Sequence, residues 1–131
     1  MEAKELMIGD WVECVDSTHK KKVYAQIDAI EEGQTCILVR LDNCNWFLDI
    51  SFIKPIPLTC EIIEKNGFVE WMDKCYRWEY AEGIYINIDF TEEEPWAHIS
   101  NRCYSATPVC RYVHELQHAF KLCGVEKEMV L

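Results

Sequence analysis

The chain lacks the features that direct a protein to a membrane or out of the cell. No stretch of its 131 residues approaches the roughly 20 consecutive apolar residues of a membrane-spanning helix. Its first residues lack the positively charged start and the apolar run of a secretory signal peptide. We therefore expect a cytoplasmic protein without a membrane partner.

Positive charge is also scarce. The chain has 13 Lys and Arg against 23 Asp and Glu, a net charge of −10 at pH 7. Nucleic acids and anionic membranes attract basic surfaces, so this charge argues against direct binding to either. The one basic cluster, residues 19–22, is typical of a solvated hairpin tip. An acidic surface can serve solubility, a basic partner or mimicry of a phosphate backbone, and the sequence leaves these explanations open.

Paired cysteines and several catalytic motifs are missing. The eight cysteines are scattered singly without a C-x-x-C motif, so the sequence indicates neither a disulfide framework nor a zinc–thiolate cluster. Cys36 and Cys123 fall at apolar positions, and we expect the cysteines to be reduced and to pack as small hydrophobic residues. Phosphate-binding loops, dinucleotide fingerprints, the G-x-S-x-G motif and internal repeats are absent.

The first half of the chain is rich in short β-prone stretches. Residues 1–57 contain several such stretches separated by turns, and they end in the rigid sequence Ile-Lys-Pro-Ile-Pro. This pattern is typical of a small curled sheet or an SH3-like barrel. Next, Thr59 is a suitable N-cap, and Gly67 follows Asn66 where a helix should end. Residues 60–66 are therefore predicted to form a short helix.

Residues 68–105 favour a second, antiparallel sheet. Apolar residues occupy alternate positions of one expected strand: Ile84, Ile86, Ile88 and Phe90. We expect the C-terminal helix to cover that face. Trp78 lies in an alternating aromatic stretch that could stack on a base or a sugar, although aromatic residues of a sheet more often belong to its core. The acidic run 91–94 lacks the spacing of a calcium loop and is better explained as a charged loop that protects a sheet edge.

The longest helical pattern spans residues 108–124. Pro at its start and Gly at its end are typical helix boundaries. At about 100° per residue, its apolar residues form one stripe about 120° wide that should face the core. This stripe contains Val109, Tyr112, Val113, Leu116, Ala119, Phe120 and Cys123.

This pattern contains the pentapeptide HELQH at residues 114–118, which matches the H-E-x-x-H motif of zinc hydrolases. In such an enzyme, His114 and His118 would bind zinc and Glu115 would be the general base. The helical projection places both histidines opposite the apolar stripe. On the same side, Arg111 lies one turn before His114 and Lys121 lies one turn after His118. Fixed cations disfavour a bound metal ion.

A catalytic zinc ion also needs a third protein ligand and an open water position. The candidates stand at no recognised spacing: His98, Cys103, Glu126 and Glu128. The alternative is a solvated polar face on which Arg111 and Glu115 form a pair. We prefer that alternative and assign no catalytic, cofactor-binding or metal-binding residue.

Three stretches carry a resemblance over the outline of the whole chain. They are KELMIGDWV at residues 4–12, PIPLT followed by IIEKNGF within 55–68, and YVHELQ at 112–117. Together they resemble a group of small proteins encoded in gut Bacteroidetes and their phages or mobile elements. The resemblance implies no particular activity. The helix of that group resembles Val-His-x-Leu-Gln without a required second His, so His118 would depart from it.

These observations predict an α+β protein. We expect a small SH3-like β-barrel module at residues 1–57, and a module at 58–131 with a helix, an antiparallel sheet and a C-terminal amphipathic helix. The function we expect is that of a non-enzymatic cytosolic interaction module, accessory to a phage or mobile element. Its partner would be another protein, and no cofactor is implied. The alternative is a zinc-dependent hydrolase that uses His114, Glu115 and His118.

Overall fold

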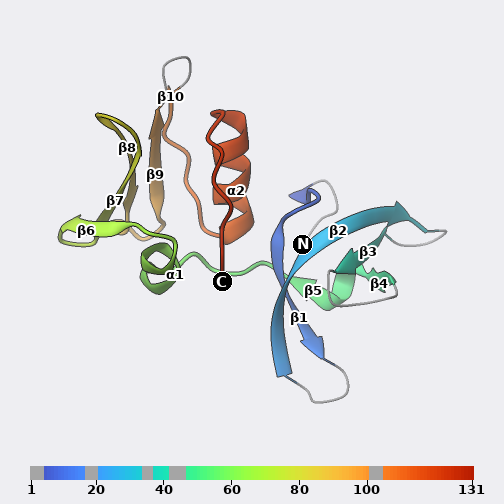
Figure 1. The fold of residues 1–131 in the computed structure, drawn as a ribbon. Helices are drawn as coiled ribbons and strands as arrows, with labels where there is room; N and C mark the ends of the chain where they lie inside the picture. The colour runs from blue at the N-terminus through green and yellow to red at the C-terminus, as the bar shows by residue number, and fades with distance from the viewer. Residues whose placement is uncertain (1–4, 17–20, 34–36, 42–46, 101–104) are drawn as a thin grey trace. The chain divides into compact units, whose positions relative to one another are not determined.

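The computed structural model describes residues 5–16, 21–33, 37–41, 47–100 and 105–131. The chain divides into two compact units, residues 1–56 and 57–131, and each is described by itself. The architecture is α+β but mostly β, with two five-stranded antiparallel sheets, a short helix and a C-terminal helix (Figure 1). No helix in the described ranges is long and apolar enough to cross a lipid bilayer.

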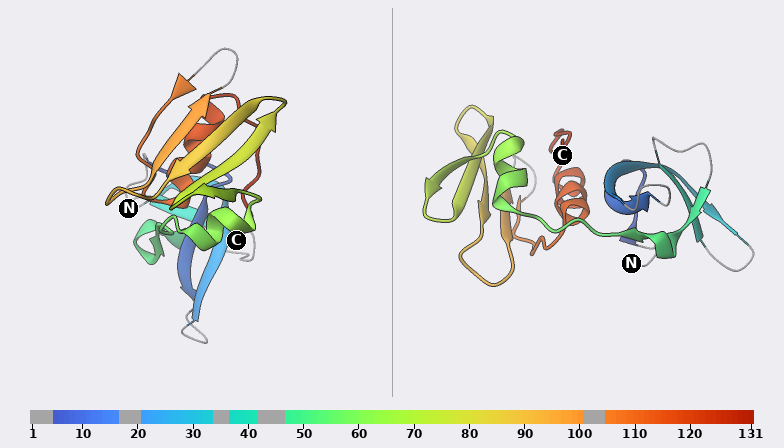
Figure 2. Two further views of the ribbon diagram at one scale, coloured as in Figure 1. Left: turned by 90° about the vertical axis from the view of Figure 1, so that its left-hand side faces the viewer. Right: turned by 90° about the horizontal axis from the view of Figure 1, so that it is seen from below.

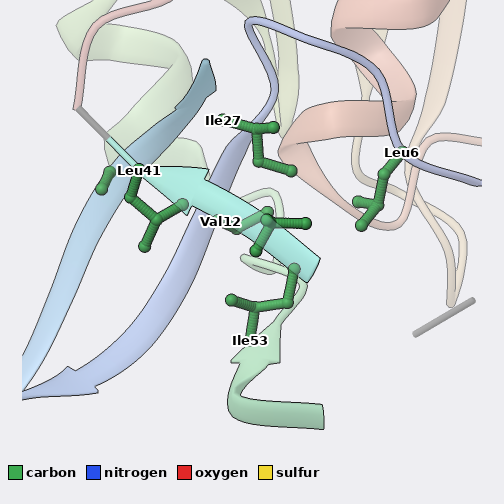
Figure 3. Packing of buried hydrophobic residues seen from close by; sticks show 7 residues of the cluster. Leu6, Val12, Ile27, Leu41 and Ile53 are labelled. Carbon is green, nitrogen blue, oxygen red and sulfur yellow. The ribbon is translucent and has the colours of Figure 1, made fainter. Parts of the chain in front are cut away.

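The first unit is a sheet with the strand order β4-β3-β2-β1-β5. Its strands are β1 (Trp11–Asp16), β2 (Lys21–Glu32), β3 (Ile37–Leu41), β4 (Phe47–Asp49) and β5 (Ile53–Lys54), with a 3-10 turn, η2 (Ile50–Phe52), before β5. Alternation along these strands brings apolar residues to one core (Figure 3), which contains Leu6, Val12, Ala25, Ile27, Val39, Leu41 and Ile53. The basic cluster 19–22 follows β1, but residues 19 and 20 lie outside the described ranges.

The second unit is a sheet of consecutive neighbours, in the order β10-β9-β8-β7-β6, with a helix before it and a helix after it. Its elements are α1 (Cys60–Lys65), β6 (Val69–Met72), β7 (Cys75–Ala81), β8 (Ile84–Asp89), β9 (Trp96–Ser100), β10 (Ser105–Ala106) and α2 (Val113–Leu122). The helix α2 lies behind the sheet in the left view of Figure 2. One face of the sheet is therefore covered by α2.

The ends of α1 confirm the sequence prediction. The Thr59 hydroxyl accepts a hydrogen bond from the amide of Ile62 at 3.3 Å, as an N-cap should. At the other end, Gly67 has a φ of 89°, and the amide of Phe68 donates to the carbonyl of Ile63 at 3.2 Å. This is the Schellman arrangement, which needs a residue with positive φ and explains why Gly stands there.

The inner face of the second sheet forms most of this unit's core. Ile86 and Ile88 are fully buried, which confirms that the alternating stretch of β8 faces the helical cover. Tyr76 on β7 and the β9 residues Ala97 and Ile99 are buried beside them. The five cysteines that the structure describes form no disulfide, and Cys110 and Cys123 are buried as small apolar residues, whereas Cys36 lies outside the described ranges.

The predicted start of the C-terminal helix is wrong. The helix begins at Val113, and the residues before it run beside other strands. Val109 bridges to Trp96, and Tyr112 bridges to Pro57. These contacts use the backbone groups that a helix over 108–112 would need. The predicted end at Gly124 is confirmed, because Gly124 has a φ of 71° and the following amide donates to Phe120.

The segment after α2 is the last part of the second unit. Residues 125–131 have no regular secondary structure. They are nevertheless held to the unit, because Val125 and Met129 are 4% and 3% exposed. The segment contacts the end of α1 through Asn66 and contacts β7 through Trp78.

Candidate functional site

The H-E-x-x-H pentapeptide occupies the first two turns of α2, and its first histidine is not on a solvated face. His114 is 4% exposed, so the prediction that both histidines face solvent is wrong. Its ring stacks on that of Tyr112, with centroids 5.8 Å apart and an interplanar angle of 9°. Because the chain before α2 is extended, Tyr112 is placed as the N-cap residue and its ring covers His114. The ring of His118 meets His114 edge-on at 5.5 Å.

Glu115 has a structural role at the start of α2. Its Oε1 accepts hydrogen bonds from the backbone amides of Arg111 and Tyr112, both at 3.1 Å. These amides precede the first turn and have no partner within the helix, so the carboxylate caps it. The predicted ion pair between Arg111 and Glu115 is wrong, because the Arg111 guanidinium pairs with Glu94 at 2.7 Å.

The candidates for a third zinc ligand do not join the histidine pair. His98 is exposed between the buried Ala97 and Ile99, so it lies on the face of the sheet away from α2. Cys103 lies outside the described ranges, and Glu126 and Glu128 are exposed in the segment after α2. Within the described ranges, no three His, Cys, Asp or Glu residues gather closely enough to hold a metal ion. The zinc alternative thus has two ligands in the part of the chain that the structure describes.

A groove of about 290 Å³ lies beside α2. Among the described residues that line it, Glu115, His118 and Cys123 are titratable and the others are apolar. The neighbouring thiol of Cys110 is no nucleophile at neutral pH, because burial, assisted by the charge of Glu115, raises its pKa to about 12. The described residues of this groove do not combine a nucleophile, a base and an oxyanion donor of the kind that hydrolysis needs.

The most distinctive surface of the second unit is the sheet face opposite α2. We call it the outer face and define it by Trp71, Arg77, Tyr85, Trp96 and His98. Strand pairing places these side chains together, because the partner of Arg77 across the sheet is Asn87, whose own partner is His98. Tyr85 lies on the same face of β8 as Asp89, and Asp89 pairs with Trp96 on β9, so both aromatic side chains are on the outer face.

Arg77 is held between two aromatic rings at the centre of the outer face. Its guanidinium carbon lies 4.0 Å from the ring centroid of Trp71 and 4.4 Å from that of Tyr85. Its Nε donates a hydrogen bond of 2.9 Å to Oδ1 of Asn87. Two cation–π contacts and one hydrogen bond fix the planes of three side chains. This surface is therefore pre-ordered.

The outer face exposes a large apolar area. Trp71, Tyr85 and Trp96 are 47%, 38% and 37% exposed, and the adjoining edge strand β6 adds Val69 at 68% and Met72 at 54%. In the left view of Figure 2 this face is turned toward the viewer, and no other element of the second unit's described part covers it. Large apolar side chains that stay exposed on one face of a sheet fit a contact with a partner.

The outer face was not predicted from the sequence, although the sequence contains part of the signal for it. The alternation that places Tyr76 and Trp78 on one face of β7 necessarily places Arg77 on the other. Trp78 itself packs against Phe68, at 6.0 Å between ring centroids, and under the amine of Lys127 at 4.3 Å. The proposed stacking platform at Trp78 is therefore occupied by the chain itself.

A comparison of the chain with protein-family models, curated sequences and solved structures gave no match.

Proposed function

We propose that this protein is a non-enzymatic binding module and that the outer face is its contact surface. The observation that carries the proposal is the pre-ordered Trp71–Arg77–Tyr85 stack on an exposed sheet face. Trp, Tyr and Arg are the residue types that contribute most to protein–protein binding energy. Their fixed orientation lowers the entropy cost of binding, since little side-chain freedom remains to be lost.

The partner we propose is another protein in the cytoplasm. The net charge of −10 opposes an approach to nucleic acids or anionic membranes, whereas an exposed aromatic surface suits a protein partner. The cysteines that the structure describes form no disulfide, which is consistent with a reducing compartment. A role as an accessory to a phage or mobile element rests on the sequence resemblance alone.

For residues 1–57 we propose an SH3-like barrel. The support is the strand order β4-β3-β2-β1-β5, in which β1 pairs with both β2 and β5, together with the 3-10 turn before β5. The apolar residues of these strands also share one core, which agrees with such a barrel. A fold does not define a ligand, so this unit adds no activity to the proposal.

Affinity capture with quantitative mass spectrometry tests the outer face. Trp71→Ala should reduce capture of a specific partner about tenfold or more, because truncation of a central aromatic residue commonly costs about 2 kcal/mol of binding free energy. The matched control is Phe52→Ala, which removes an aromatic ring of 67% exposure from η2 and should retain the partner. Equal capture by wild type and Trp71→Ala would refute the proposal.

The zinc hydrolase remains the alternative, and one observation favours it. The His114 and His118 rings lie 5.5 Å apart, close enough to share a ligand. Elemental analysis of untagged, reduced protein, with His114→Ala in parallel, separates the two functions. Stoichiometric zinc that is lost in the variant would replace the binding module with the hydrolase.

A further inference from the structure

The negative charge of the second unit is concentrated in its sheet. Residues 57–131 contain 13 Asp and Glu against 7 Lys and Arg. Eight of those acidic residues and only two of the basic ones lie between residues 69 and 100, which form β6 to β9 and the connections between them. The rest of the unit, with both helices, has five of each. The strands that form the outer face therefore carry the whole negative excess of this unit.

Carboxylates lie on the outer face and in the turns beside it. Glu79 is exposed on the same side of β7 as Arg77. Asp73 and Glu82 are exposed in the turns that join β6 to β7 and β7 to β8, and Glu92 is exposed in the connection from β8 to β9. Charges around a contact surface attract a partner of opposite charge and repel one of like charge.

One carboxylate lies next to an exposed ring of the outer face. Asp89 on β8 is the cross-strand partner of Trp96 on β9, and side chains of directly opposed residues are neighbours. The hydroxyl and the amide of Thr91 donate hydrogen bonds of 2.6 and 2.8 Å to Oδ1 of Asp89. These hydrogen bonds, chiefly that of the hydroxyl, lower the pKa of Asp89, so the carboxylate is ionised at neutral pH.

The outer face itself shows how its rings hold a cation. The guanidinium carbon of Arg77 lies 4.0 and 4.4 Å from the ring centroids of Trp71 and Tyr85. Trp96 is 37% exposed, and among the described residues no Lys or Arg side chain lies over its ring. A ring face beside an ionised carboxylate can offer a cation both a cation–π contact and an ion pair.

We propose that the partner of the outer face is a basic segment of another protein, and that an Arg or Lys side chain of this segment binds over Trp96 beside Asp89. The inference rests on the proposed function, because it names the chemistry of the partner at that same surface. A second copy of the chain would bring a further net charge of −10, and a nucleic acid would bring phosphates. Neither has the complementary charge.

Selection from a displayed library of short random peptides tests the chemistry of the partner. Peptides are selected on the full-length protein and counter-selected on Trp71→Ala, with both proteins folded by circular dichroism. The retained peptides need the outer face, and they should be enriched in Arg and Lys over the starting library. Retained peptides without this enrichment would overturn the inference and leave the proposed function standing. The absence of any peptide that needs Trp71 would overturn both.

Point variants test the place of the cation, with the tightest retained peptide as a fluorescent probe in anisotropy titrations. Asp89→Asn keeps an oxygen for Thr91 but removes the charge, and it should weaken binding about threefold or more. Trp96→Leu keeps an apolar side chain but loses the ring face, and a similar loss is expected. The matched control is Glu126→Gln, which removes an exposed charge after α2 and should leave the affinity unchanged. Equal affinities of Asp89→Asn and Glu126→Gln would overturn the assigned place.

Salt distinguishes a contact that depends on charge from a purely apolar one. Between about 0.1 M and about 1 M NaCl the Debye length falls from about 10 Å to about 3 Å. The affinity of wild type for the probe should fall about fivefold or more over this range, and that of Asp89→Asn should fall less. An affinity independent of salt would overturn the inference. Sedimentation of the protein alone tests the other occupant, because a dimer that Trp96→Leu abolishes would replace the basic segment with a second copy.

Discussion

The two faces of the second sheet are built from the same strands and differ in burial. On the inner face, Ile86 and Ile88 are fully buried and remove apolar area from water, which stabilises the fold by about 1.5–3 kcal/mol for each such side chain. On the outer face, Trp71 and Tyr85 stay exposed and instead hold Arg77 in place. Period-two alternation therefore separates buried from exposed side chains residue by residue, so substitutions on the two faces should differ in their effect on stability.

The largest effect is expected on the inner face. Ile88→Ala should lower the free energy of unfolding by about 2–5 kcal/mol, because it removes transfer energy and leaves a cavity in a fully buried site. Urea denaturation followed by tryptophan fluorescence measures the change. Tyr85→Ala, on the same strand but on the outer face, should cost less than half as much. Equal losses would mean that the two faces are not functionally distinct.

The second largest effect on stability is expected when a buried polar contact is removed. Asn66→Ala should lower the free energy of unfolding by about 1–3 kcal/mol, since it removes a buried amide that makes hydrogen bonds to both backbone groups of Val130. The control is Asn87→Ala, which removes an amide of the outer face that accepts from Arg77. Water can replace that contact, so thermal denaturation should show a smaller shift. A larger shift for Asn87→Ala would contradict the assignment of the outer face to recognition.

The cap of the helix that covers the inner face should have a smaller effect. Glu115→Ala should cost about 1 kcal/mol of unfolding free energy, as loss of a helix cap does. Glu115→Gln keeps an oxygen that can accept from the same amides and should cost less. Chemical denaturation of both variants tests this role. Identical stability of Glu115→Ala and wild type would leave the carboxylate without a structural explanation and strengthen the zinc alternative.

The elements predicted correctly from the sequence are those whose structure is decided by local interactions. Both α1 and the end of α2 depend on residues within one turn, such as Thr59, Gly67 and Gly124, and these were predicted correctly. The alternation of β8 likewise predicted which side of the sheet is buried.

The predictions were wrong where contacts between distant parts of the backbone decide the structure. The stretch before α2 has a helical apolar pattern, but it forms β-bridges to Pro57 and Trp96 instead. The periodicity of a sequence does not predict such long-range bridges. His114 was therefore assigned to solvent although Tyr112 covers it. A prediction of the outer face would have required the register of β6, and the pairing of β6 with β7 shifts between Glu70 and Met72. A local pattern does not reveal such a bulge.

The smallest effect on stability, and the clearest division between the faces, is expected for Arg77→Lys. Lysine keeps the positive charge but loses the planar group that stacks between Trp71 and Tyr85. At this partly exposed site the unfolding free energy should fall by no more than about 1 kcal/mol. Partner capture should nevertheless fall, because the two rings lose the spacer that fixes them. Unchanged capture would show that the face binds without its central stack. A loss of stability as large as that of Ile88→Ala would show that the outer face, like the inner, serves the fold.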